Sequence, residues 1–232
     1  MTEGDLEVLE MVRLEIIATS LADAIAAEQG GADSVEVCVD LALDGLTPPL
    51  DMVKAMRDAV RIDMHVMLRP HNNGFVYGES EVAAMLAQID LFRPLGIQSL
   101  VFGAHRKDGA LDVNLIRRMA QAAAPLPLTV HRALERSTDP EEALRRLVGI
   151  VARILTSGPA ASAAEGRAGL RRWVQAFGTF YRFAAAGGIR LENARDIMLF
   201  TGAHECHVGT AARTDDAVDP HKVRLLRAVI QP

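Results

Sequence analysis

Ionisable side chains interrupt several short apolar segments of this 232-residue chain, and their types suit acid–base or metal chemistry. Burying one unpaired ion costs several kcal/mol, so such groups must pair with one another or meet a ligand. An internal salt-bridge network is the structural alternative to a functional site, and the sequence leaves both open. The set consists of Glu15, Glu36, His65, Arg69 and His131, with His207 as a further candidate.

Residue alternation assigns these side chains to one face of their strands. Val35, Val37 and Val39 share a face, so Glu36 lies on the opposite face, together with Cys38. The segments 64–69, 128–131 and 205–208 alternate in the same way and put their histidines, and Arg69, on the polar face. If helices cover the apolar face, the polar face must line an interior.

The elements that position these residues alternate regularly along the chain. We expect strands at 14–18, 34–38, 64–69, 100–103, 128–131, 153–156, 182–185 and 205–208. Helices are expected at 21–29, 50–60, 79–92, 113–122, 141–150, 163–177, 191–199 and 221–230. Eight strands, each followed by a helix, predict an α/β fold of the (β/α)₈ TIM-barrel type. A doubly wound sheet is the alternative, with fewer strands as a rule.

Glycine-bearing turns follow the last three predicted strands. In this architecture the loops after strands seven and eight commonly bind phosphate, because backbone N–H groups there are free. Ordinary tight turns are the alternative explanation. Arg190 or Arg213 could add a charged contact to an anion. The candidate anion site comprises Ser157, Gly158, Gly187, Gly188, Gly209 and Thr210.

Composition narrows the function classes. The formal net charge is -5, and the basic residues are scattered, which argues against nucleic acid as a partner. No apolar run reaches the roughly 18 residues of a membrane span, and the acidic start resembles no secretory signal. Two cysteines cannot form a disulfide framework, so a cytoplasmic protein is expected. We expect an N-terminal extension at 1–12 and one barrel domain at 13–232.

Seven segments together resemble the CutC family in order along the chain. They are LEIIATSLADAIAAEQGGADSVEVC (14–38), GLTPP (45–49), VMLRP (66–70), LVFGA (100–104), VHRAL (130–134), ILTSG (154–158) and AAGGIR (185–190). The resemblance implies a TIM-like barrel, a cytoplasmic location and a role in copper homeostasis, without an agreed reaction. The signature polar positions of the family fall on Glu15, Glu36, Arg69, His131 and Arg132.

The chain also departs from the family pattern. The family usually has a cysteine soon after the first glutamate, where this chain has Ile16 and Ile17. An Arg-Gly-Gly-Asp-Phe stretch is replaced by residues 71–75, and the aspartate after the HRAF motif is Glu135 here. The first departure weakens a thiolate copper site, and the second alters a loop over the barrel mouth.

Three functions remain open at this point. Copper binding follows from the resemblance alone, with Cys38 as a weak ligand candidate, because Cu(I) favours thiolates and thioethers. Cys206 is expected to face the helices, so it should not share a metal ion with Cys38.

The second reading is an enzyme acting on a small anionic or phosphorylated compound. In it, His131 is the general acid–base, Glu36 or Glu15 orients it or binds a divalent metal, and Arg69 and Arg132 hold the anion. The third is a non-catalytic ligand-binding barrel, and a homo-oligomer is compatible with all three.

Overall fold

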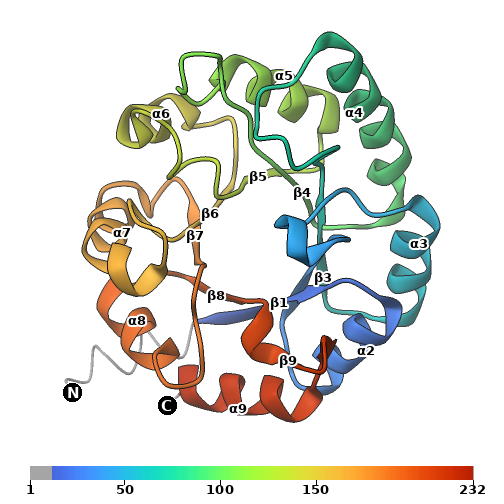
Figure 1. The fold of residues 1–232 in the computed structure, drawn as a ribbon, viewed down its shortest axis with the longest axis vertical. Helices are drawn as coiled ribbons and strands as arrows, with labels where there is room; N and C mark the ends of the chain where they lie inside the picture. Colours follow the sequence, from blue (N-terminus) through green and yellow to red (C-terminus); the bar gives the residue numbers. More distant parts are fainter. Residues whose placement is uncertain (1–11, 232) are drawn as a thin grey trace.

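Eight parallel strands close into a barrel in the computed structural model, which describes residues 12–231 (Figure 1). Each strand pairs with the next in the chain, and the eighth pairs with the first. The single-domain TIM-barrel prediction is therefore confirmed, and the doubly wound sheet is excluded. The strands are β1 (Arg13–Ala18), β2 (Ser34–Val37), β3 (Asp63–Met67), β4 (Ser99–Phe102), β5 (Leu128–Val130), β6 (Arg153–Thr156), β7 (Arg182–Ala185) and β8 (Glu205–Val208).

Helices surround the barrel and follow the strands in turn (Figure 1). Several begin at a residue whose side chain accepts a hydrogen bond from a first-turn N–H, as Ser20, Asp139 and Ser162 do. The helices are α2 (Leu21–Gln29), α3 (Leu50–Ala59), α4 (Glu79–Phe92), α5 (Val113–Ala123), α6 (Pro140–Leu147), α7 (Ala163–Phe177), α8 (Ala194–Thr201) and α9 (Pro220–Ile230). None of these helices, within the described part of the chain, is long and apolar enough to cross a membrane.

Short elements that the sequence did not predict follow β8. The glycine-bearing turn after β8 holds one 3₁₀ turn, η3 (Thr210–Ala212), and opens no α-helix. A hairpin of β9 (Arg213–Thr214) and β10 (Ala217–Val218) follows, and α9 begins only at Pro220. Likewise α8 begins at Ala194 rather than 191, because Asn193 accepts from the N–H of Arg190 in the preceding turn.

The apolar core lies mainly between the barrel and its helices, as the alternation predicts. Outward-facing strand residues such as Leu14, Val35 and Cys206 belong to this large cluster. Inside the lumen the apolar clusters are small, one of them formed by Cys38, Met67 and Val101. Much of the lumen is thus left to polar side chains. Of the predicted extension at 1–12, all but the buried Val12 lies outside the described residues.

Candidate functional site

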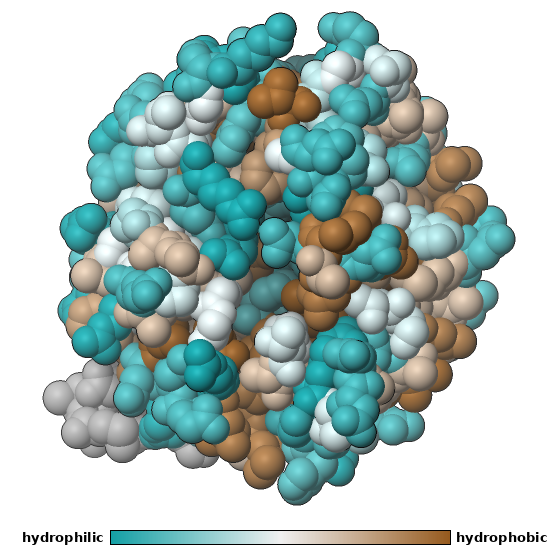
Figure 2. Space-filling view, in the orientation of Figure 1, coloured by the Kyte–Doolittle hydropathy of each residue, from teal (hydrophilic) through white to brown (hydrophobic). Residues whose placement is uncertain are grey.

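A cavity of about 340 Å³ opens at the carboxyl ends of the strands. Figure 2 shows the recess near the centre of the face viewed in Figure 1, with hydrophilic residues beside it. In this architecture that end of the barrel holds the active site. The lining residues are Ile17, Glu36, Leu41, Asp44, Met67, Arg69, Phe75, His131, Arg132, Arg136, Leu155, Ala186, Gly187, Gly188, Ile189, His207, Gly209 and Thr210.

Most of the polar residues that the sequence assigned to a functional site line this cavity, but five of the assigned site positions do not. Glu36, Arg69, His131, Arg132 and His207 line it, together with four of the six predicted anion-site residues. The prediction that Glu36 and His131 lie inside the lumen near its mouth is confirmed. The five that do not line the cavity are Glu15, His65, Cys38, Ser157 and Gly158.

A cluster of two carboxylates and one imidazole forms the floor region: Glu36 and His207 line the cavity, and Glu15 lies directly behind them. Register places Glu15 of β1 beside His207 of β8. Glu15 Oε2 accepts from His207 Nδ1 at 2.6 Å and from Arg153 Nη2 at 2.6 Å. One potential ligand atom each from Glu15, Glu36 and His207 lies within 4.8 Å of the other two. Glu15 Oε1 and Glu36 Oε2 are buried and have no hydrogen-bond partner among the residues that the structure describes.

Burial and neighbouring charges shift the pKa values in this cluster in different directions. Burial alone would raise the pKa of Glu15, but the charge of Arg153 and the hydrogen bond from His207 hold it well below its usual value. Burial raises the pKa of Glu36 to about 7, with the charge of Glu15 adding to the effect. Although burial opposes it, the charge of Glu36 and the hydrogen bond to Glu15 raise the pKa of His207.

Below this floor, a salt-bridge network fills the barrel. Glu205 accepts from Arg153 at 2.7 Å and from Arg182 at 2.9 Å, and Arg153 also reaches Glu15. His65 belongs to this level, since its Nε2 lies 3.7 Å from Glu15 Oε1, and its Nδ1 bonds to Ser99 at 2.7 Å. Burial and the charge of Arg153 lower the pKa of His65 to about 4. The structural alternative raised from the sequence therefore applies to the lower half of the lumen.

His131 follows β5 and lies beneath Phe75. Its Nδ1 accepts from the N–H of Ala133 at 3.1 Å, and its buried Nε2 has no hydrogen-bond partner in the described part of the chain. Burial and the charge of Arg69 lower the pKa of His131 to about 3. The neutral ring thus carries its proton on Nε2, which favours hydrogen-bond donation over the general-base role expected from the sequence.

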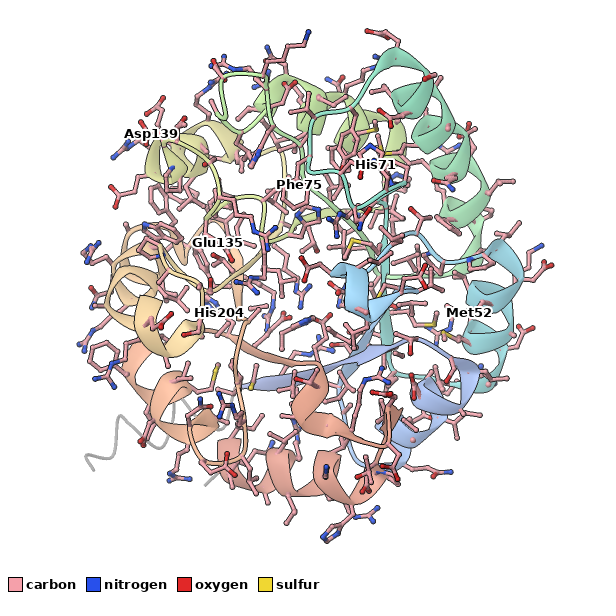
Figure 3. The ribbon with its side chains drawn as sticks, viewed as in Figure 1. Met52, His71, Phe75, Glu135, Asp139 and His204 are labelled. Atoms are coloured by element: carbon pink, nitrogen blue, oxygen red, sulfur yellow. The ribbon has the colours of Figure 1, made fainter. Side chains whose placement is uncertain are left out.

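Arginines form the rim of the cavity. Arg69 Nη1 donates to the carbonyls of Leu43 (2.9 Å), Asp44 (3.2 Å) and Gly45 (3.2 Å). The Arg69 and Arg136 guanidinium carbons lie 5.1 and 5.7 Å from the centre of the Phe75 ring. Figure 3 shows Phe75 beside the barrel mouth. Sequence reasoning missed Arg136, because it follows the strand in a loop where alternation gives no orientation.

Arg132 joins the loops after β5, β6 and β7. It donates to Glu135 at 2.6 Å and to the carbonyl of Ala161 at 2.7 Å. Glu135, labelled in Figure 3, also accepts from the Ser157 hydroxyl at 2.8 Å, so Ser157 has a structural partner. A Cβ at Gly187 would lie 3.2 Å from the Arg132 guanidinium carbon, so the two are in close contact.

Three further members of the expected anion site lie elsewhere. Gly158 packs against α7, where a Cβ would lie 2.6 Å from the carbonyl of Gly166. Arg213 pairs with the buried carboxylate of Asp23 at 3.0 Å instead of turning to the cavity. Arg190 is exposed on the surface. The candidate anion site contracts to Gly187, Gly188, Gly209 and Thr210 with their arginine neighbours.

Both cysteines are free and buried, and they lie in different parts of the core. Cys206 packs on the helix side of β8, whereas Cys38 packs with Met67 inside the lumen. Burial raises the pKa of Cys206 to about 12 and that of Cys38 further. These thiols are therefore protonated at neutral pH and are poor metal ligands in this state.

Comparison with known proteins gives consistent similarities. The model of the CutC family matches residues 12–212. A family protein CutC from Mesorhizobium japonicum is 38% identical over 195 residues, covering 84% of this chain and 76% of that protein. A human copper homeostasis protein cutC homolog is 34% identical over 206 residues, covering 88% and 76%.

Solved structures agree on the fold. The putative copper homeostasis protein CutC from Streptococcus agalactiae has a TM-score of 0.81 at 26% identity, covering 86% of this chain and 98% of that one. Phosphoribosyl anthranilate isomerase from Thermotoga maritima has a TM-score of 0.63 at 14% identity, covering 93% and 96%. The latter likeness concerns the barrel fold alone.

Proposed function

Since this chain belongs to the CutC family, we propose that it serves copper homeostasis in the cytoplasm, with the mouth cavity as its working site. The names of the human and streptococcal relatives support the first part. For the cavity itself we propose a small organic anion, such as a phosphorylated metabolite, as the ligand. The observation that carries this choice is the meeting of arginines and unpaired backbone N–H groups in one wall.

The anion-binding wall combines two kinds of donor. Within residues 12–231, the backbone N–H groups of Gly187 and Gly188 donate no hydrogen bond. Both residues have positive φ, 89° and 69°, and the Arg132 guanidinium lies against Gly187. Adjacent amides in such a turn, beside a guanidinium, are a recurrent arrangement for an oxyanion. His131 also lines the cavity, and its Nε2–H is a further donor without a partner among residues 12–231.

The sulfur atoms do not fit a dedicated Cu(I) site. Cu(I) is held by soft thiolates and thioethers. Cys38 has Met67 as a sulfur-containing neighbour, but its thiol is buried and its pKa is raised by that burial. Cys206 belongs to a separate cluster. We therefore propose a role in copper homeostasis that does not depend on a thiolate copper carrier.

Calorimetric titration with inorganic phosphate and sugar phosphates tests the anion site. We expect saturable binding, and we expect Arg136→Gln to weaken it about 10-fold through loss of one charge-assisted contact. Arg145→Gln on the outer surface of α6 is the matched control and should leave binding unchanged. No binding at millimolar ligand would refute the proposal. Replacing Gly188 is unsuitable, because its φ of 69° strains any other residue.

Cu(I) titration tests the sulfur argument separately. The Cys38→Ser/Cys206→Ser variant should bind Cu(I) no more weakly than the wild type. Loss of stoichiometric Cu(I) binding in that variant would restore the thiolate carrier as the function.

A further inference from the structure

We propose that Glu15, Glu36 and His207 form a site for one divalent transition-metal ion at the floor of the mouth cavity. Each residue offers a ligand atom within 4.8 Å of the other two, a spacing that one ion can bridge. The three side chains come from β1, β2 and β8, which are neighbours in the closed sheet. Strands hold such ligands more rigidly than loops do.

Two unpaired oxygen atoms identify the position of the ion. Glu15 Oε1 and Glu36 Oε2 are both buried, and no donor within residues 12–231 forms a hydrogen bond to either, although His65 Nε2 lies 3.7 Å from Glu15 Oε1. Glu15 is fully buried and Glu36 is 3% exposed. A buried carboxylate oxygen without a donor is costly, and a cation between the two would stabilise both.

His207 presents its Nδ1 to the Glu15 carboxylate. Nδ1 and Glu15 Oε2 lie 2.6 Å apart and share a proton. An ion shared by the two residues would take the place of that proton and bind Nδ1, because Nε2 points away from Glu15. Arg153 donates to Glu15 Oε2 from the other side and so fixes the carboxylate.

The donor set selects the class of ion. Two carboxylates and one imidazole suit Mn²⁺, Fe²⁺, Co²⁺ or Zn²⁺, whereas Cu(I) requires sulfur and Ca²⁺ favours oxygen alone. Three protein ligands leave a coordination position open, as in catalytic metal sites. Glu36 and His207 also line the cavity, so that open position faces it.

Charge balance connects the ion to the ligand above it. When His207 is neutral, the cluster holds three negative charges, on Glu15, Glu36 and Glu205. Only the two positive charges of Arg153 and Arg182 balance them. The floor then carries one negative charge, and a divalent ion makes it positive. A positive floor complements a small anion, and this last step rests on the proposed function. The metal site itself does not.

Titration of the chelator-treated full-length chain with Co²⁺ alone tests the site. We expect one ion per chain, d–d absorption from oxygen and nitrogen ligands, no thiolate charge-transfer band, and displacement by Zn²⁺. Glu36→Gln should weaken binding at least about 100-fold, the upper range for loss of an outer-shell partner. Asp44→Asn, the same chemical change at the rim of the same cavity, and Cys38→Ser should leave binding unchanged.

The contrary outcomes are equally specific. Absence of saturable one-to-one binding, a thiolate band, or equal loss in Asp44→Asn would overturn the site. If Glu36→Gln fails to fold, the wild type provides a second test. Co²⁺ should broaden the imidazole NMR resonances of His207 and leave those of the exposed His221 unchanged. The reverse pattern would also overturn the metal site. Phosphate binding is measured without metal, so failure of either proposal leaves the other standing.

Discussion

His131 occupies a space that depends on the absence of one side chain in the neighbouring strand end. A Cβ at Gly103 would lie 2.6 Å from His131 Cε1 and 2.9 Å from Ala133 Cβ. Gly103→Ala should therefore displace the imidazole and destabilise the protein by about 1–3 kcal/mol, the usual cost of overpacking. Urea unfolding measures this, and the cost should shrink in a His131→Ala background, where the ring is gone. An equal cost in both backgrounds would contradict the packing argument.

The buried His131 also predicts a pH dependence of stability. Its pKa in the folded chain is about 3, because burial and Arg69 disfavour the charged ring, whereas an unfolded histidine titrates near about 6.5. Between these values the unfolded chain binds the extra proton, so this residue lowers stability as the pH falls. In His131→Gln, unfolding free energies measured from pH 6 to pH 4 should show a slope shallower by about 1.4 kcal/mol per pH unit. His221→Gln on the surface of α9 is the control; an unchanged slope in His131→Gln would count against the buried neutral ring.

At the residue scale, the alternation of apolar and polar residues predicted which face of the sheet a side chain lies on, wherever the strand continues. It placed Glu36 and His207 correctly inside the lumen, because period-two geometry is local. The same reasoning applied to β6 would have identified Arg153, which shares a face with Leu155. Hydrogen bonds such as Ala133 N–H to His131 could not be predicted, because they depend on the path of a loop after the strand.

At the scale of elements, Arg69 connects the end of β3 to the segment around η1 (Leu41–Leu43). One guanidinium nitrogen holds three consecutive carbonyls there, including those of Asp44 and Gly45. Arg69→Ala should cost about 1.5–3 kcal/mol and free this segment over the cavity mouth. Hydrogen exchange should then accelerate at residues 41–46 and stay unchanged in the β9–β10 hairpin. Uniform acceleration in both segments would indicate general destabilisation instead of a local restraint.

Element types were predictable from the sequence, but the structure after β8 was not. The eight strands follow from short β-branched segments, and the start of α6 follows from Asp139 and Pro140. The η3 turn and the hairpin depend on tertiary contacts, chiefly Arg213 with Asp23 and the N–H of Val218 with the same carboxylate. Residues 23 and 213 are distant in sequence, so no local pattern indicates the pair.

At the scale of the whole molecule, the barrel lumen has two levels with different roles. The lower level is closed by ion pairs, and the upper level is an open cavity with unpaired polar atoms. Glu15 belongs to both, because Arg153 holds its Oε2 from below, whereas its Oε1, 3.7 Å from His65 Nε2, accepts no hydrogen bond from residues 12–231. Structural pairing below thus positions the acid that we assign to the metal ion above.

Arg153 is the central cation of the lower network, since it pairs with both Glu15 and Glu205. It joins β6 to β1 and β8 across the lumen, and without it Glu15 would keep only its bond to His207 and Glu205 only its pair with Arg182. Removing one partner of a buried ion pair costs about 3–5 kcal/mol, because the remaining charge has lost its compensation. For a chain of this size, Arg153→Met should lower the melting temperature by about 6–20 °C. Arg145→Met, at exposed ion pairs with Glu141 and Glu142 on α6, removes a charge of the same kind where solvent screens it and should have almost no effect. Calorimetry of both variants decides the matter: similar small shifts would mean that the lower network fills the barrel without holding it together.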